Sequence, residues 1–110
     1  MNIRVQVDGF AITDKVSFHR VFAAVMGFPE FYGNNMDAWI DCMEDLRTPE
    51  NGMTRFALGH ASLLEIELLN CEAFREAAGE LFGSLLDCIA CVNANEVERG
   101  RIASIALIPR

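Results

Sequence analysis

Four carboxylates fall on one face of a predicted helix in the first half of the chain. When residues 36–46 are placed about 100° apart around a helix axis, the four lie within an arc of about 100°. They are Asp37, Asp41, Glu44 and Asp45. Carboxylates gathered on one rigid element can pair with arginines and lysines, so this face is a candidate for binding a basic partner. Two carboxylates one turn apart could also hold Mg²⁺ or act as acid and base.

This face departs from an ordinary solvated helix surface in two ways. Like charges four residues apart, as in Asp37, Asp41 and Asp45, destabilise a helix by ~0.2–0.5 kcal/mol per pair. No lysine or arginine lies within the helix to offset them. Glu44 and Asp45 also lie near its C-terminal end, where the helix dipole disfavours negative charge. The pattern leaves two interpretations open, a functional acidic face and a merely solvated one.

Composition restricts the partners that this protein can have. The chain has 110 residues, of which 16 are acidic and 9 basic, for a formal net charge of −7, and 52% are hydrophobic. These values predict a single globular domain, residues 1–110, with a hydrophobic core. The segment Glu30–Glu50 alone holds six acids and one base. We expect no direct nucleic-acid binding and no membrane binding, because both need a basic surface, and a charged partner should itself be basic.

The other groups capable of chemistry are scattered. His19 falls within a predicted helix and is expected to pack there, and His60 lies in a loop without a nucleophile beside it. Cys88 and Cys91 form a C-x-x-C motif inside an apolar helical run, away from a helix N-terminus that would stabilise a thiolate. A zinc site would need two further ligands at suitable spacing. We therefore expect no enzyme activity, no cofactor and no bound metal.

The sequence also predicts a compartment. Its first residues lead into a short alternating run rather than a signal peptide, and no apolar stretch reaches the ~20 residues of a bilayer span. We expect a cytoplasmic protein whose cysteines are free thiols. The cysteines are Cys42, Cys71, Cys88 and Cys91.

Three segments have strand patterns. Alternation with a period of two predicts strands at Ile3–Val7 and Leu64–Leu69. A nearly continuous apolar run, Ile102–Ile108, predicts a third strand covered on both faces.

Helical segments separate these strands. Asp14 and Gly27 are expected to bound the first helix, and Asn34 or Asn35 is expected to cap a second that reaches about Leu46. Between the second and third strands lies a third helical segment.

This third helical stretch covers residues 71–93, with Asn70 as its expected cap, and it can break at Gly79 or Gly83. The order β-α-α-β-α-β favours parallel pairing, so we predict a small α/β domain with a three-stranded parallel sheet.

The segment Phe28–Met43 resembles the loop and second helix of the barstar family, intracellular inhibitors of barnase-type ribonucleases. The resemblance rests on the pattern Pro-Glu-aromatic-Tyr-Gly-x-Asn-aliphatic-Asp-Ala-x-x-Asp, which begins at Pro29. It extends in outline over most of the chain, with an apparent insertion at about Arg47–Ala61. The insertion could extend the core or form a second contact, through Met53, Phe56 and Leu58. The resemblance implies a three-stranded parallel sheet flanked by three to four helices, with neither catalysis nor a cofactor.

The resemblance also implies which residues bind a partner. Asp37 and Asp41 match inhibitory aspartates, and Asn35 matches an interface asparagine. Where the family has aromatic anchors, Phe31 stands in place of a tyrosine and Ile40 in place of a tryptophan. Leu46 replaces a second tryptophan, Glu44 and Asp45 replace a threonine–glycine pair, and Glu96 is the candidate for a late interface glutamate. The expected partner-binding residues are Phe31, Tyr32, Asn35, Asp37, Ile40, Asp41, Glu44 and Asp45.

Together these features predict a proteinaceous ribonuclease inhibitor, or immunity protein, that plugs a nuclease active site with the acidic face of its second helix. Asp41 is the expected deepest anchor, and Phe31, Tyr32 and Ile40 are the expected apolar rim. The partner would be a basic extracellular-type ribonuclease or another nuclease toxin. Two alternatives remain: a non-inhibitory acidic interaction module of the same fold, and a Mg²⁺-dependent hydrolase using Asp37 and Asp41.

Overall fold

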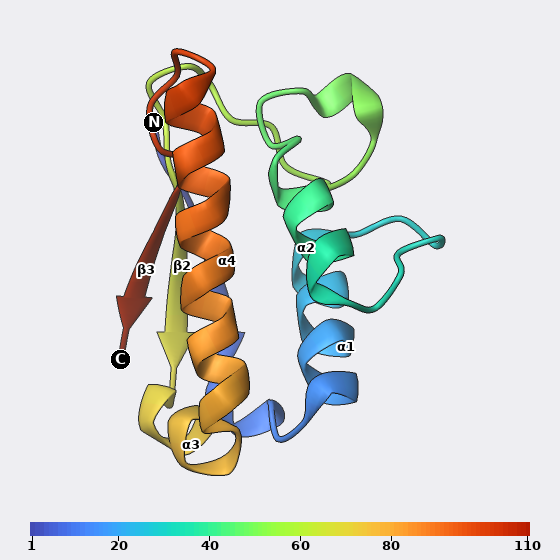
Figure 1. The fold of residues 1–110 in the computed structure, drawn as a ribbon, viewed down its shortest axis with the longest axis vertical. Coiled ribbons are helices and arrows are strands. Elements are labelled where there is room, and N and C mark those ends of the chain that lie inside the picture. Colours follow the sequence, from blue (N-terminus) through green and yellow to red (C-terminus); the bar gives the residue numbers. More distant parts are fainter.

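Three parallel strands form one sheet in the order β1-β2-β3 (Figure 1). The computed structural model describes all residues from 1 to 110. In the pairing register, Val5 lies opposite Ile66, which lies opposite Leu107. The strands are β1 (Ile3–Asp8), β2 (Leu64–Leu69) and β3 (Ile105–Pro109). The predicted fold class is therefore confirmed.

Four helices accompany the sheet. They are α1 (Lys15–Met26), α2 (Met36–Met43), α3 (Cys71–Ala77) and α4 (Gly79–Glu98), with 3-10 turns at Gly9–Ala11 and Pro49–Asn51. Figure 1 shows the long α4 beside β2, and α3 where β2 ends. The helices α1 and α2 lie next to one another, alongside α4. The arrangement packs α2 against α4, so that the short helix is supported by the longest one.

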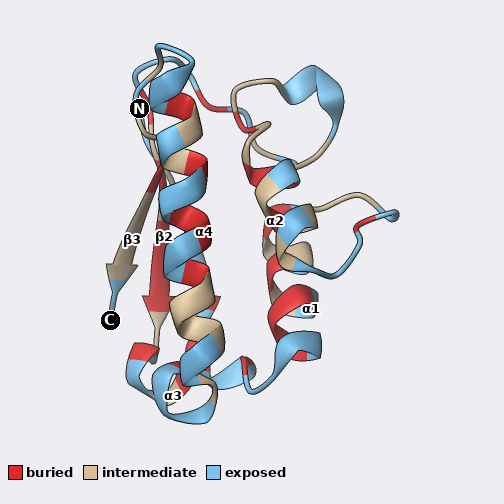
Figure 2. Ribbon diagram, viewed as in Figure 1, coloured by how far each residue is buried: buried red, intermediate tan, exposed pale blue.

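The core lies between the sheet and the helices. β1 and β2 turn alternate apolar side chains inward, and β2, the central strand, is the most buried (Figure 2). The largest side chains that are fully buried come from the helices, among them Phe18 and Phe22 of α1, Trp39 of α2 and Phe74 of α3. Because α2 contributes Trp39 and Met43 to this core, one side of the helix is fixed inward.

The helix starts confirm the capping predictions for α1 and α2. The backbone N–H of Ser17 donates to Asp14 Oδ1 at 2.8 Å, and the Asp14 N–H donates to the Ser17 hydroxyl at 3.0 Å, which forms a reciprocal capping box. Gly27 ends α1 at φ = 67°, a left-handed conformation that suits glycine. Of the two asparagines that could cap α2, Asn35 does so, since its Oδ1 accepts the Ala38 N–H at 2.8 Å.

Other boundaries differ from the predictions. α2 ends at Met43, three residues before Leu46, because the chain turns there toward the next segment. Asn70 does not cap α3 with its side chain: it adopts φ = 52° and donates instead to Asp8 Oδ1 at the end of β1. The third helical stretch breaks at Ala78 and continues as α4 to Glu98.

The last strand is also shorter and less buried than its apolar sequence predicts. β3 begins at Ile105 rather than Ile102, and it is an edge strand in which only Ile105 is buried. An edge strand of a three-stranded sheet lacks a neighbour on one side, so its apolar side chains stay half-exposed.

No single helix of the protein has the length and apolar composition needed to cross a membrane. The pair α3 and α4 meets that test only when taken together, and the two helices are bent by 118° relative to one another.

A buried ion pair ties the chain after α2 to α4. The Arg47 side chain is 2% exposed, and its Nη1 donates to Glu96 Oε2 at 2.8 Å. Arg101 holds the same carboxylate with two bonds of 2.8 Å. Burial alone would raise the pKa of Glu96, but the hydrogen bonds from Arg101 and Arg47 outweigh it and hold the pKa below its ordinary value.

The Arg47 guanidinium also donates to four backbone carbonyls. They are those of Gly59, Ser62, Ile102 and Ala103. Glu96 is thus enclosed and fully occupied, so the suggestion that it is an interface glutamate is wrong.

Replacing Arg47 should destabilise the fold far more than replacing an exposed arginine. Arg47→Ala leaves a buried carboxylate and four carbonyls short of donors, so we expect a loss of about 3–5 kcal/mol in the free energy of unfolding. Arg75→Ala, which removes an exposed pair with Glu72, should cost no more than about 0.5 kcal/mol. Urea unfolding of both variants measures the difference, and equal losses would contradict the role given to Arg47.

Candidate protein-binding surface

The orientation of α2 leaves two carboxylates facing solvent. Trp39 and Met43 are fully buried, and Asp37 and Asp41 lie on the opposite side of the helix, exposed. Neither carboxylate forms an ion pair with any cation of the protein. Two like charges are therefore held one turn apart on a rigid element, without an intramolecular counterion.

The other two carboxylates form contacts within the protein. Glu44 is paired with a cation, which corrects the expected row of four acids without counterions to three, and Asp45 is hydrogen-bonded to a neutral amide. Glu44 Oε2 lies 3.1 Å from Arg99 Nη1, and the side-chain amide of Asn95 donates to both Glu44 oxygens at 3.3 Å. Asp45 Oδ2 accepts from the Asn51 amide at 3.2 Å. Since α2 ends at Met43, these two residues lie in the following turn and reach sideways, toward α4 and toward the 3-10 turn.

The loop before α2 is fastened to α1 through Tyr32. The Tyr32 side chain is 8% exposed, and its hydroxyl shares a 2.6 Å hydrogen bond with His19 Nδ1. The ring also packs on Phe28, with centroids 4.6 Å apart. Tyr32 therefore holds the loop in place and offers little surface to a partner, in contrast to the expected apolar rim.

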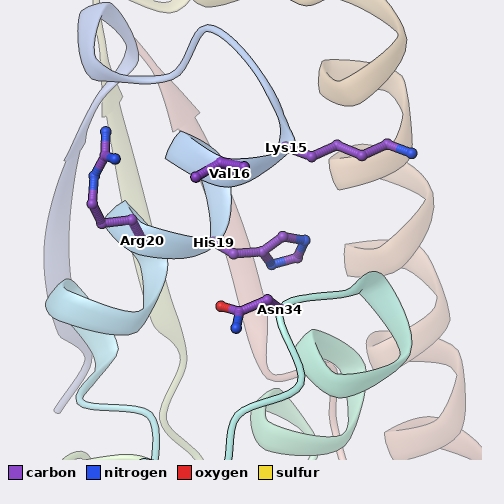
Figure 3. A pocket seen from close by; sticks show the side chains of 5 residues that line it. All are labelled: Lys15, Val16, His19, Arg20 and Asn34. Carbon is purple, nitrogen blue, oxygen red and sulfur yellow. The ribbon is translucent and has the colours of Figure 1, made fainter.

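His19 is one of five residues that line a small pocket (Figure 3). Its ring points toward Asn34, whereas the side chains of Lys15 and Arg20 extend away in different directions. Burial lowers the pKa of His19, helped by the charge of Lys15, and burial raises the pKa of Tyr32. The imidazole is thus neutral and the phenol protonated at neutral pH, the states in which they can share a hydrogen bond.

The remaining expected contact residues differ in how much surface they offer. Phe31 is 76% exposed at the tip of the loop. Ile40 is half-buried, packed against the core. Asn35 is exposed, but its Oδ1 is used in capping α2.

A hollow of about 270 Å³ lies beside Asp41, between the loop and α2. It is lined by Phe31, Tyr32, Gly33, Ala38, Asp41, Cys42 and Met53. Met53 comes from the segment after α2. The sequence raised it only as one of three residues of an insertion, because nothing local shows that this segment folds back beside Asp41.

The groups considered for catalysis or metal binding do not assemble into a site. No group of three or more His, Cys, Asp or Glu side chains could hold a metal ion. Cys88 is buried in the middle of α4 and Cys91 is exposed there, and all four cysteines are free. Burial raises the pKa of Cys42 to about 11 and also raises the pKa of Cys88, so neither is an activated thiolate.

Comparison with known families gives a match over almost the whole chain. The family described as Barstar (barnase inhibitor) matches residues 3–107, which include both loops around α2. None of the curated proteins matches the chain.

Acid should weaken the protein through His19. Because the folded state holds the pKa of His19 below its ordinary value of 6.5, the unfolded chain takes up a proton first. The stabilisation is complete above that value and is lost as the pH falls from about 6.5 through the lower folded pKa. Urea unfolding should therefore give a lower stability at about pH 5 than at about pH 7.

His19→Gln should flatten this dependence, and His60→Gln, at an exposed histidine, should leave it unchanged. An unaltered slope in the His19 variant would show that other groups cause the acid sensitivity.

Proposed function

The chain belongs to the barstar family, and we propose that it inhibits a ribonuclease by plugging the active site with α2 and the loop before it. The observation that supports this proposal most directly is the pair Asp37 and Asp41, exposed, adjacent and without counterions of their own. An acidic pair of this kind, on a protein of net charge −7, favours a strongly basic partner.

The proposed mechanism is occlusion. A ribonuclease active site carries arginine, lysine and histidine side chains placed to bind a phosphodiester, and carboxylates can form charge-assisted hydrogen bonds with the same groups. The Asp37 and Asp41 backbone is fixed by α2, so little conformational entropy is lost when the partner binds. Asp41, next to the hollow and to the exposed ring of Phe31, is the proposed central anchor.

Glu44 and Asp45 have a smaller part in this proposal. Each already has a partner in the protein, Arg99 or Asn51. Direct binding of a nuclease would compete with these contacts, most of all at Glu44, where both carboxylate oxygens are engaged. We therefore assign them mainly to the long-range field that attracts a basic partner.

The proposed location is the cytoplasm, with the nuclease being one that is normally secreted. All four cysteines are free thiols, and three of them are buried, which fits a reducing compartment. An inhibitor in the cell that makes such a nuclease would act as an immunity protein, protecting the cell's own RNA before export.

Removing Asp41 should weaken binding strongly, whereas removing Glu44 should not. Asp41→Ala would leave desolvated cations of the nuclease unpaired, so we expect a loss of about 2–5 kcal/mol in binding free energy, mostly through faster dissociation. Glu44→Ala, the matched loss of one carboxylate next to α2, should cost less than about 1 kcal/mol. Calorimetry and inhibition assays with barnase and with other basic secreted ribonucleases provide the measurements.

Three results would contradict parts of this proposal. Equal losses in the two variants would remove Asp41 from its central role. Binding to a ribonuclease without inhibition would instead indicate a non-inhibitory interaction module. Inhibition that survives Asp37→Ala and Asp41→Ala together would place the contact elsewhere on the protein.

Association should also depend strongly on salt. If the free carboxylates steer the encounter, the association rate constant should fall steeply as the ionic strength rises from about 0.01 to about 1 M, since the screening length shortens from ~30 to ~3 Å. The dissociation rate constant should change much less. Stopped-flow mixing at several salt concentrations tests this, and an association rate that is independent of salt would exclude steering.

A further inference from the structure

The segment Thr48–Leu58, which follows α2, is fastened at both ends. The Leu58 N–H donates to the Leu46 carbonyl at 2.7 Å, and the Arg55 N–H donates to the Met26 carbonyl at the end of α1 at 2.9 Å. The Arg47 guanidinium, held by Glu96, fixes the start of the segment. Although it lacks long regular elements, the segment has a defined path over the core.

This path brings Met53 to the hollow beside Asp41. The Asn51 side-chain amide donates a hydrogen bond to Asp45. Gly52 then turns the chain at φ = 68°, and Met53 follows it. Met53 is half-buried and lines the hollow together with Phe31 from the loop before α2. Figure 1 shows these two connections, before and after α2, projecting on the same side of the helix.

The walls of the hollow have two kinds of chemistry. Phe31, Met53 and Ala38 supply apolar surface, and the exposed ring of Phe31 presents a π face. Asp41 supplies a carboxylate that has no counterion in the protein. An occupant that satisfies both has an apolar stem and a cationic head, and a planar guanidinium can pair with a carboxylate and also stack on an aromatic ring.

Resting on the function proposed above, we propose that Met53 is a specificity-determining contact and that the hollow receives an arginine side chain of the partner. Met53 packs on the aliphatic stem, Phe31 on the guanidinium plane, and Asp41 pairs with its charge. The docking surface then has three elements: the loop before α2, α2 itself, and the segment after it. A flexible thioether at this position suits an irregular apolar contact.

Methyl NMR of the whole protein tests the pocket without requiring an identified nuclease. The chain has five methionines, of which Met26 and Met43 are fully buried and serve as internal references. The probes are N-acetyl-arginine amide, N-acetyl-lysine amide and, as an uncharged analogue with an aliphatic stem, N-acetyl-norleucine amide. We expect N-acetyl-arginine amide to shift the Met53 methyl signal in a saturable way, and N-acetyl-norleucine amide to bind much more weakly.

Variants separate the contributions of the two walls. Asp41→Asn should abolish the response to N-acetyl-arginine amide. Met53→Ala, followed through the Ala38 methyl group, should weaken the binding about fivefold or more, because it removes the apolar contact to the stem. Phe56→Leu, in the same segment but facing Arg4 and Val25 away from the hollow, should leave the affinity unchanged.

Several outcomes would overturn the inference. Equal affinities for the arginine and norleucine probes would mean an apolar occupant, and a response that survives Asp41→Asn would exclude charge pairing. No response of the Met53 methyl to any probe, or equal effects of Met53→Ala and Phe56→Leu, would remove Met53 from the docking surface.

The same experiment distinguishes this inference from the proposed function. If the protein binds the arginine probe at Met53 but inhibits no ribonuclease, the arginine pocket is supported and the proposed inhibitor function is contradicted. If inhibition depends on Asp41 but Met53→Ala changes neither inhibition nor probe binding, the inhibitor function is supported and the contact at Met53 is contradicted.

Discussion

The direction of the carboxylates depends on three side chains that are almost entirely buried. Trp39 and Met43 lie on the inner side of α2, and Leu46 lies three residues beyond the end of the helix. Fully burying a large apolar side chain stabilises a fold by about 1.5–3 kcal/mol. Repulsion between Asp37 and Asp41 costs only ~0.2–0.5 kcal/mol. Burial of the three side chains together therefore outweighs the repulsion by at least about tenfold. The helix cannot rotate to relieve the repulsion without exposing its tryptophan, so the two acids stay outside and close together.

The Arg47–Glu96 pair fixes the path of the chain after α2. A buried ion pair gains little net stability over an apolar replacement, because both charges lose their hydration, but it tolerates only the geometry that satisfies it. Arg47 joins Glu96 on α4 to carbonyls just before β2 and just before β3, and so sets where the segment Thr48–Leu58 begins. Without that anchor, nothing in the short α2 would determine whether Met53 lies beside Asp41.

The sequence predicted the features that depend on neighbours along the chain. The period-two alternation located β1 and β2, and the capping residues Asp14, Gly27 and Asn35 were found by their types, because each acts within four residues of its partner. The angular positions on α2 correctly separated the buried Trp39 from the exposed Asp41 for the same reason.

Contacts between distant residues were not predictable in this way. Glu44 pairs with Arg99, Tyr32 with His19, and Asn70 with the end of β1, and each contact redirects a side chain whose local pattern suggested another role. Asp37 and Asp41 are exposed as predicted, and the prediction that no cation of the protein neutralises these acids is wrong for Glu44; the role of this surface in binding a partner stays a prediction. The hollow at Met53 arises from the same kind of long-range contact.

The tryptophan of α2 lies one position before the one that the family resemblance implies for an interface tryptophan. The resemblance implies a tryptophan at the position of Ile40, about 60° from Asp37 around the helix and beside the acids. Here the tryptophan is residue 39, about 100° further round and inside the core.

The indole Nε1 of Trp39 is buried without a hydrogen-bond partner, at a cost of about 1–3 kcal/mol. Burial of the apolar part of the ring must therefore stabilise this position. Trp39 therefore adds no aromatic group to the exposed surface. What remains beside Asp41 is a hollow walled by Phe31 and Met53, which can accept a side chain rather than insert one. Recognition on this surface then depends on the charge and shape of the side chain that the partner inserts, more than on apolar groups that this protein presents.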